Sequence, residues 1–324
     1  MSPPDDLLLP RPAVSVVVPF AGGPEEASRV YAMLTSLQTR PGDELILSDN
    51  SAHAPAPPER VQRVIAAGER SPGHARNRGA AQATGDWILF LDADVQPPMD
   101  LIERFFAVPI SARTGAVTGD IAGVPDTSTL AARYATARNF LGQRAHVNHP
   151  LRPRASSANL LVRRAAFVAI GGYTEGILAA EDTDLIWRLA GAGWGLEFNE
   201  QAVVHHAYRT SLRALGRQWR GYAAGARWLS ERYPDFKPDP GLRRGLRLLL
   251  HRFGIGAGLS VRADGHSAPA ATAITRRDRI LFLAVQVYLA IEEQIGLRLS
   301  NAADGGGADG DAADHRRLGR WRRR

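Results

Sequence analysis

Residues 87–94 read Trp-Ile-Leu-Phe-Leu-Asp-Ala-Asp, an apolar run with strand character that stops at two carboxylates. Asp92 and Asp94 are two positions apart, and residues i and i+2 of a strand point the same way. Such a pair suits a hard divalent cation, Mg²⁺ or Mn²⁺, which can bridge to substrate phosphates. A single Asp-x-Asp also closes strands as a turn or a helix cap. The stretch therefore suggests an enzyme acting on a phosphorylated or nucleotide-activated substrate, with a plain strand end as the alternative.

The composition excludes several classes of protein. The chain has 324 residues, is 44% hydrophobic and contains no cysteine. It can therefore bury a core, but it cannot form a disulfide, a zinc–thiolate site or a cysteine nucleophile. The formal net charge of +7 permits nucleic acid, anionic membranes or phosphorylated ligands as partners. We see no helix-turn-helix, zinc-finger or RNA-binding signature, so nucleic acid is not an expected partner.

Strands and helices alternate through residues 13–240. The first half shows strands at 14–19, 44–47, 61–66 and 87–91, with helices at 25–38 and 74–84. The second half shows strands at 116–121, 159–162 and 196–204, helices at 127–143, 181–190 and 212–233, and a basic loop at 144–157. This alternation predicts an α/β domain with a mostly parallel sheet and helices on both faces. Ligands would then bind at the carboxyl ends of the strands.

The two ends of the chain differ in character from this domain. Residues 1–12 lack the features of a secretory signal, and we expect them and the Gly/Asp-rich, basic tail at 301–324 to be disordered. Residues 241–300 are expected to form a helical C-terminal extension whose segments 242–250 and 276–299 combine arginines with apolar residues. Such helices can lie on an anionic membrane, or they can pack on the domain or on a second copy. No stretch is long enough to span a bilayer, so we expect a cytoplasmic protein, with peripheral contact to the inner face of the plasma membrane left open.

Six short motifs follow one another in a fixed order. They are Val14-Ser-Val-Val-Val-Pro19, Ser48-Asp-Asn-Ser51, Ala75-Arg-Asn-Arg-Gly79, Leu91-Asp-Ala-Asp94, Gly171-Gly-Tyr173 and Glu181-Asp-Thr-Asp-Leu185. This order, over residues 14–220, resembles the family 2 glycosyltransferases, whose GT-A fold has a Rossmann-like, mostly parallel sheet flanked by helices. The resemblance implies transfer of a sugar from a nucleotide diphosphate donor to a hydroxyl group, with inversion at the anomeric carbon. The Gln-x-x-Arg-Trp motif and transmembrane helices of processive members are missing, which implies a non-processive enzyme.

The resemblance also implies a nucleotide and metal site. Its nucleotide-binding residues are Pro19, Asp49, Asn50, Arg76 and Asp92. The Asp49 carboxylate would accept a hydrogen bond from the imide N–H of uracil or thymine, which favours a UDP- or dTDP-sugar. Arg76, near a helix start, would face the diphosphate. Asp94 would ligate Mn²⁺ or Mg²⁺ directly, with Asp92 beside it.

The catalytic residues implied by the resemblance lie in the second half. Asp182 would be the general base that takes the proton from the acceptor hydroxyl, and Glu181 would help to place the acceptor. His205 and His206 alternate along a strand, so only one of them can face the metal site. The resemblance favours His206 as the residue that completes this site, with a surface or packing histidine as the alternative. Asp184 and Arg188 fall at i and i+4, where a helix-surface ion pair is expected.

Two other functions stay open at this point. A nucleotidyltransferase would share the sheet and the carboxylate-bound metal, but it usually carries a glycine-rich, lysine-bearing phosphate loop that we do not find here. A catalytically inactive nucleotide-sugar-binding or scaffold protein is the other alternative, although the intact Asp92, Asp94 and Asp182 argue against it. The expected acceptor is a glycan, a lipid-linked sugar or another component of the cell envelope.

Overall fold

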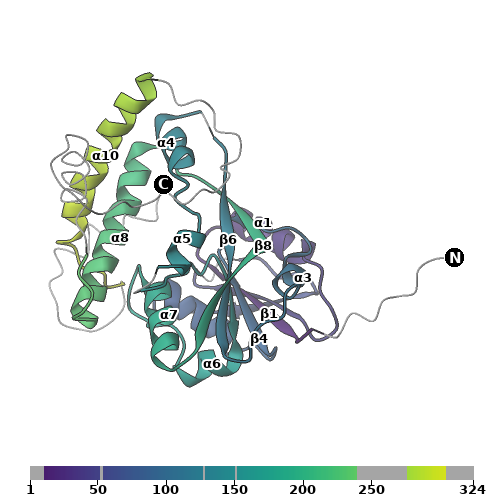
Figure 1. The fold of residues 1–324 in the computed structure, drawn as a ribbon. Coiled ribbons are helices and arrows are strands. Elements are labelled where there is room, and N and C mark those ends of the chain that lie inside the picture. Colours follow the sequence, from purple (N-terminus) through teal and green to yellow (C-terminus); the bar gives the residue numbers. More distant parts are fainter. Residues whose placement is uncertain (1–10, 52–53, 127, 150–151, 239–275, 304–324) are drawn as a thin grey trace.

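A computed structural model describes residues 11–51, 54–126, 128–149, 152–238 and 276–303 of the chain. One eight-stranded sheet forms its centre, in the order β3-β2-β1-β4-β7-β6-β8-β5 (Figure 1). The strands are β1 (Val14–Phe20), β2 (Glu44–Asp49), β3 (Val61–Ile65), β4 (Trp87–Leu91), β5 (Val95–Gln96), β6 (Thr114–Val124), β7 (Asn159–Arg163) and β8 (Gly195–Ala207). The first four run parallel, β7 is antiparallel to both β4 and β6, and β6 is parallel to β8. The predicted α/β fold with a mostly parallel sheet is confirmed.

Both faces of the sheet are buried, which explains why its central strands are continuous apolar runs. Trp87, Leu89 and Leu91 pack on one face, whereas Ile88 and Phe90 pack on the other. The first face is covered by α1 (Pro24–Ser36) and α3 (Leu101–Phe105). The second is covered by α2 (Pro72–Ala80), α6 (Arg164–Ala169) and α7 (Glu181–Gly191). The two-residue period of the strands therefore sorts side chains between two cores.

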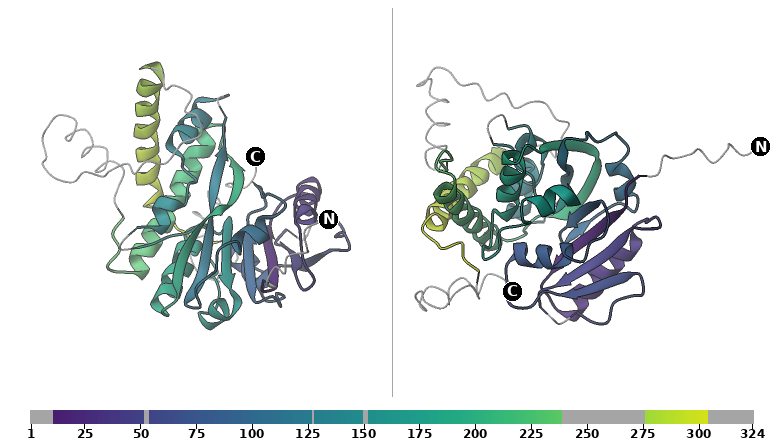
Figure 2. Two further views of the ribbon diagram at one scale, coloured as in Figure 1. Left: turned by 45° about the vertical axis from the view of Figure 1, so that its right-hand side comes forward. Right: turned by 90° about the horizontal axis from the view of Figure 1, so that it is seen from below.

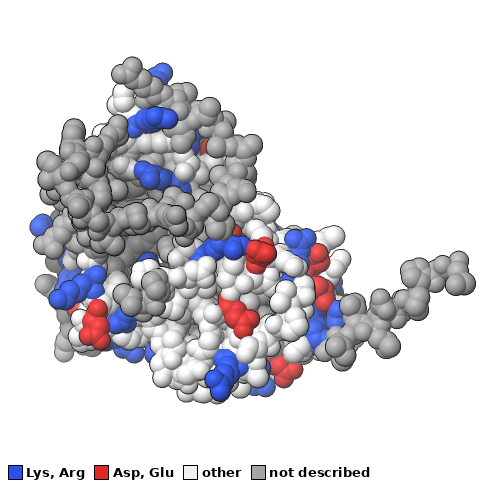
Figure 3. All heavy atoms as spheres, viewed as in Figure 1, with Lys and Arg blue, Asp and Glu red and all other residues white. Residues whose placement is uncertain are grey.

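A helical layer lies beside the sheet. It consists of α4 (Leu130–Arg138), α8 (Leu212–Arg232) and α10 (Arg276–Gly296), with the short α5 (Arg144–Val147) nearer the strands. Two views show α10 running alongside α8 and α4 (Figure 2). Arg220 of α8 forms an ion pair with buried Glu292 of α10. Cationic side chains appear at the end of the molecule where α10 begins, while the acidic side chains visible on that face lie mainly over the sheet (Figure 3).

Several boundaries differ from the sequence prediction. The helix expected at 127–143 is interrupted, because Asn139 adopts a left-handed conformation (φ 45°) and caps α4. The elements β5, α3 and α6 are too short to show a period and were not predicted. Asn301 and Ala303, expected in the disordered tail, are ordered and buried. The segment expected at 242–250 lies outside the described residues. None of the described helices combines the length and apolarity that a bilayer crossing requires.

Candidate active site

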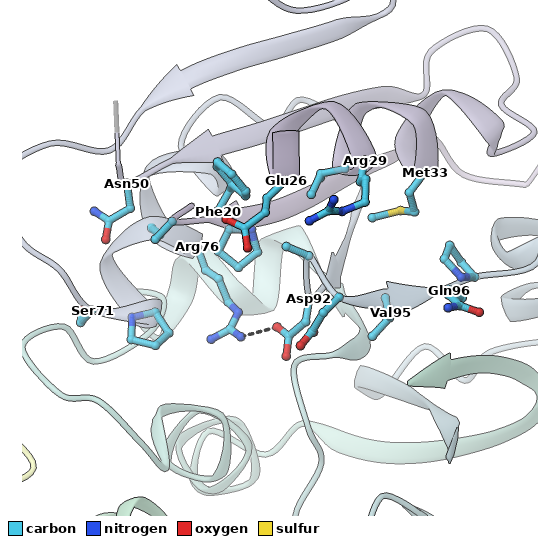
Figure 4. A pocket seen from close by; sticks show the side chains of 18 of the residues that line it. Phe20, Glu26, Arg29, Met33, Asn50, Ser71, Arg76, Asp92, Val95 and Gln96 are labelled. Atoms are coloured by element: carbon cyan, nitrogen blue, oxygen red, sulfur yellow. Dashed lines mark hydrogen bonds and ion pairs between the residues drawn. The ribbon is translucent and has the colours of Figure 1, made fainter. Parts of the chain in front are cut away.

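A cavity of about 980 Å³ opens at the carboxyl ends of β1 and β4 (Figure 4). This volume is at the upper end of the range for small-molecule sites. The cavity is lined by residues of β1, α1 and α8, of the β4–β5 turn, and of the starts of α2 and α7. The lining residues include Pro19, Glu26, Arg29, Met33, Asn50, Arg76, Asp92, Asp94, Glu181, Arg209 and Tyr222. Six of these residues were predicted from the sequence. The cavity thus lies where open α/β sheets bind ligands.

Arg76 connects the two acidic motifs of the site. Its Nη2 lies 2.8 Å from Asp92 Oδ1 and its Nη1 lies 2.7 Å from Glu181 Oε1. Although burial lowers it, the neighbouring carboxylates raise the pKa of Arg76 above its ordinary value. The Arg76 Nε is buried and has no hydrogen-bond partner within the described ranges. A buried guanidinium with an unused donor at a cavity is suited to hold an anionic group.

The fold fixes Arg76 through tight packing of α2. Ser71 caps this helix by accepting a hydrogen bond from the His74 amide. A Cβ atom added to Gly79 would lie 2.5 Å from a methyl carbon of Val17 and 3.1 Å from Ser48 Cβ, so only glycine lets α2 approach β1 and β2 this closely. The helix, and Arg76 within it, is therefore held against β1 and β2.

Asp92, Asp94 and His206 form the candidate metal centre. Pairing of β5 with β8 places Val95 opposite His206, and His206 Nε2 lies 3.2 Å from Asp94 Oδ1. The Asp92 and Asp94 side chains are 34% and 55% exposed. The alternation of β8 leaves His205 exposed and turns the half-buried His206 toward Asp94.

The donor groups of this centre suit a divalent cation when His206 is neutral. Although burial opposes both shifts, the Asp94–His206 hydrogen bond lowers the pKa of Asp94 and raises the pKa of His206. His206 Nδ1 lies 2.7 Å from the backbone oxygen of Ala207, which orients the ring with Nε2 toward Asp94. Two carboxylates and an imidazole oriented by a backbone carbonyl are a suitable donor set for Mn²⁺ or Mg²⁺.

Glu181 and Asp182 begin α7 beside the cavity. Burial raises the pKa of Glu181 to about 7 and also raises the pKa of Asp182, against the lowering effect of Arg76. Asp182 Oδ1 accepts a hydrogen bond of 2.6 Å from the Thr183 amide. Glu181 lines the cavity, and the half-buried Asp182 is the next residue in the sequence. A carboxylate with a raised pKa is a stronger proton acceptor than an exposed one.

Asp49 lies deeper than the sequence suggested. It is the last residue of β2, and its fully buried carboxylate accepts hydrogen bonds from the Ser51 and Ala54 amides and pairs with Arg63 at 2.7 Å. It is not among the residues that line the cavity, whereas its neighbour Asn50 is. The Asp49 carboxylate thus holds its own loop in place, and its role toward a nucleobase stays a prediction.

Asp184 and Arg188 do pair, at 2.8 Å, but not on the helix surface. The Asp184 carboxylate is fully buried and also pairs with Arg232 and accepts a hydrogen bond from Tyr233. The i, i+4 spacing correctly predicted that Asp184 pairs with Arg188. The predicted surface position of the pair is wrong, because the end of α8 covers this turn.

Several residues that line the cavity were not predicted from the sequence. Glu26, Arg29 and Met33 of α1 face the cavity, as do Arg209 and Tyr222 (Figure 4 shows the first three). The polar face of an amphipathic helix looks the same whether it meets solvent or a ligand, so no pattern in α1 marks them.

A second acidic cluster lies beside the cavity. Glu69, His74 and Glu175 place one ligand atom each within 4.8 Å of the others. The two ring nitrogens of His74 contact Glu175 Oε2 at 2.7 Å and the Ala67 oxygen at 3.1 Å, and Glu69 accepts a hydrogen bond from the Gly176 amide. Both nitrogens face oxygen acceptors, so the cluster is better explained as a hydrogen-bonded link between two loops than as a metal site.

Comparisons with known proteins agree with this geometry. Residues 15–171 match the family model for glycosyl transferase family 2. The chain is 28% identical over 260 residues to the pre-mycofactocin glycosyltransferase of Mycobacterium tuberculosis, covering 76% of this chain and 53% of that protein. It is 24% identical over 221 residues to the glycosyltransferase AglE of Haloferax volcanii, covering 64% and 71%. The chain thus spans about half the length of the mycobacterial protein.

A solved structure shares the fold. The mannosyltransferase PcManGT from Pyrobaculum calidifontis, in complex with GDP-Man and Mn²⁺, superposes with a TM-score of 0.56 at 17% identity, covering 89% of this chain and 88% of that one. This likeness supports the GT-A arrangement of the sheet, and the family model covers four of its parallel strands and the Asp92–Asp94 turn. Residues 15–171 of the chain thus belong to glycosyltransferase family 2.

Proposed function

We propose that the chain is an inverting, non-processive glycosyltransferase. It moves a sugar from a nucleotide diphosphate donor, with UDP- or dTDP-sugars favoured, to a hydroxyl of a glycan, lipid-linked or other cell-envelope acceptor. The observation that carries the proposal is the juxtaposition, through Arg76, of the Asp92–Asp94 turn with the acidic start of α7. The names of the relatives and the nucleotide sugar bound to the mannosyltransferase support the donor class.

Each group then has a defined task. Asp94, Asp92 and His206 would hold the divalent cation, which supplies neutralising charge for the leaving diphosphate. Arg76 adds charge-assisted hydrogen bonds, and Asn50 and Pro19 flank the nucleoside. Asp182 accepts the proton of the acceptor hydroxyl while that oxygen bonds to the anomeric carbon. The bond from that carbon to the diphosphate oxygen breaks in the same step, its electrons leave with the diphosphate, and the configuration inverts.

We expect donor turnover to require the cation and Asp94. The measurement is nucleotide release from UDP-, dTDP- and GDP-sugars, with Mn²⁺, with Mg²⁺ and with EDTA. EDTA or Asp94→Ala should lower release by about 10²-fold or more, because the metal contributes several kcal/mol at the leaving group. Asp100→Ala removes a carboxylate on the neighbouring segment, where Asp100 pairs with Arg104, and is the matched control.

The same experiment separates the alternatives. Release of pyrophosphate from a nucleoside triphosphate and a sugar phosphate would favour a nucleotidyltransferase. Metal-dependent nucleotide binding without release, even with acceptor extracts, would favour an inactive binding protein. If no nucleotide bound at all, the nucleotide-sugar proposal would be overturned.

We also propose that the protein works at the cytoplasmic face of a membrane, through residues 242–300. Within the described part of this region, α10 carries a stripe of apolar side chains, each 39–66% exposed: Ile280, Leu283, Val287, Ile291 and Ile295. Their spacing of three and four places them on one face, and exposed Arg277 and Arg298 flank the stripe in sequence. An apolar stripe between cations fits the boundary of an anionic bilayer.

We expect Val287→Glu to weaken binding to vesicles of phosphatidylcholine and phosphatidylglycerol by about tenfold, since a buried valine contributes roughly 1.5–3 kcal/mol. The matched control is Val168→Glu on α6, where the valine is 65% exposed and lies away from α10 (Figure 1). Co-sedimentation measures both. Equal binding by the two variants, or a wild type that dimerises through α10 and ignores vesicles, would contradict the proposal.

A further inference from the structure

The last described residues of the chain form a clamp on the loop before α7. The clamp is defined as Asn301–Ala303 and the loop as residues 176–180. Asn301 contributes most of the contacts: its Nδ2 donates to the Ala179 oxygen at 2.9 Å, its Oδ1 accepts from the Ala179 amide at 3.1 Å, and its backbone oxygen accepts from the Leu178 amide at 2.9 Å. Ala302 forms an antiparallel bridge with Ile177. The Ala303 amide donates to the Gly176 oxygen at 2.8 Å.

The clamped loop leads directly into the acidic pair of the site. Leu178 and Glu181 both line the cavity. Between them, Ala180 adopts a left-handed conformation with φ of 69°, which is unfavourable for a residue that carries a Cβ atom. Such a conformation persists only where surrounding contacts hold it. The clamp saturates the backbone groups of Ala179, the residue immediately before it.

Close packing within the helical layer supports the clamp. Gly225 of α8 packs against the loop, and a Cβ atom added there would lie 2.9 Å from Ala180 Cβ. Gly296, at the end of α10, packs even more closely on the backbone oxygen of Arg220, so a side chain there would collide with α8. Arg220 in turn pairs with Glu292 of α10. One helix thus touches both the loop and the helix that carries the clamp.

We infer that Asn301 is a positioning residue for the catalytic acids, acting through Ala179 and Ala180 on the start of α7. The inference rests on the proposed function, because it assigns Asn301 to the same reaction. It makes the segment after α10 a working part of the site, although Asn301 lies 130 residues beyond the segment that matches the family model. A donor-binding site that is complete without α10 would then still depend on it for turnover.

The test compares Asn301→Ala with Gln294→Ala in the full-length chain. Gln294 lies on α10, seven residues earlier, so its replacement leaves the contacts of Asn301 in place. Hydrogen exchange should show the amides of Leu178 and Ala179 losing protection in Asn301→Ala only. The turnover number for nucleotide release should fall by roughly 10–10²-fold, the scale expected for misplaced catalytic groups. Nucleotide affinity should stay within about threefold, because Arg76 and the metal centre do not contact the clamp.

Hydrogen exchange and nucleotide release together distinguish failure of the clamp from failure of its catalytic role. Unchanged exchange at 178–179 in Asn301→Ala would overturn the clamp itself, whether or not the wild type turns over a donor. Faster exchange with unchanged turnover would overturn the positioning role and leave the proposed function intact. A wild type that releases no nucleotide from any donor would overturn the proposed function and with it the catalytic part of the inference, whereas the exchange result would still report on the contacts. Asn301→Asp keeps the acceptor for the Ala179 amide but loses the donor to the Ala179 oxygen. The amides of Leu178 and Ala179 should therefore exchange faster in this variant than in the wild type as well.

Discussion

Replacing Asp182 by Asn should lower the turnover number by about 10³-fold while nucleotide binding persists, as expected for loss of a general base. The substitution is nearly isosteric. The amide oxygen of the new side chain can still accept the hydrogen bonds that Asp182 Oδ1 now accepts from the Thr183 amide and hydroxyl. The start of α7 should therefore keep its conformation, and the effect should fall on the chemical step. Nucleotide release and calorimetric binding of the nucleotide with Mn²⁺ measure the two quantities.

Asp184→Asn on the same helix is the informative comparison. Its carboxylate pairs with Arg188 and Arg232 in a fully buried position, so its loss should lower the melting temperature rather than act on the chemistry alone. If Asp182→Asn turned over donor at the wild-type rate, Asp182 would not be the base. Glu181, which lines the cavity and has a raised pKa, would then be the remaining carboxylate for that role.

Local patterns predicted the sheet because burial on both faces leaves a strong signal. The run Trp87–Leu91 was predicted with its true ends, since two carboxylates cannot continue a strand that is buried on both sides. The alternation of β8 likewise indicated that only one of His205 and His206 can face the site, and the pairing of β5 with β8 brings His206 to Asp94. Features of this kind depend on residues close together in sequence.

Contacts between distant residues could not be predicted in the same way. The Arg76–Glu181 pair joins residues 105 positions apart, and the Asn301 clamp spans 122 positions. Asn301 stands at the start of a Gly/Ala/Asp-rich stretch, whose composition indicates disorder even though its first three residues pair with the loop before α7. The resemblance to a family supplied the role expected for Arg76, but its position between two carboxylates came only from the fold.

Replacing Arg76 by Met should strongly destabilise the folded protein. It leaves Asp92 and Glu181 facing one another with no cation between them, and breaking a buried ion pair in this way costs about 3–5 kcal/mol. Asp92 contributes less to this cost than Glu181, because about a third of its side chain is exposed and water screens its charge. Urea denaturation without added metal measures the free energy of unfolding. Arg78→Met, at an exposed position of the same helix, is the control and should change little.

The loss in Arg76→Met should also depend on pH, with a sign set by Glu181. Its folded pKa is raised from 4.5 to about 7, so between these values the folded state holds more protons than the unfolded state and stability falls as the pH rises. Arg76 opposes that shift, and without it the folded pKa rises further. The free energy lost in Arg76→Met should therefore be larger at pH 8 than at pH 5. An equal loss at both values would mean that the guanidinium stabilises the site by packing on Tyr173, over whose ring it lies at 5.4 Å, rather than by its charge.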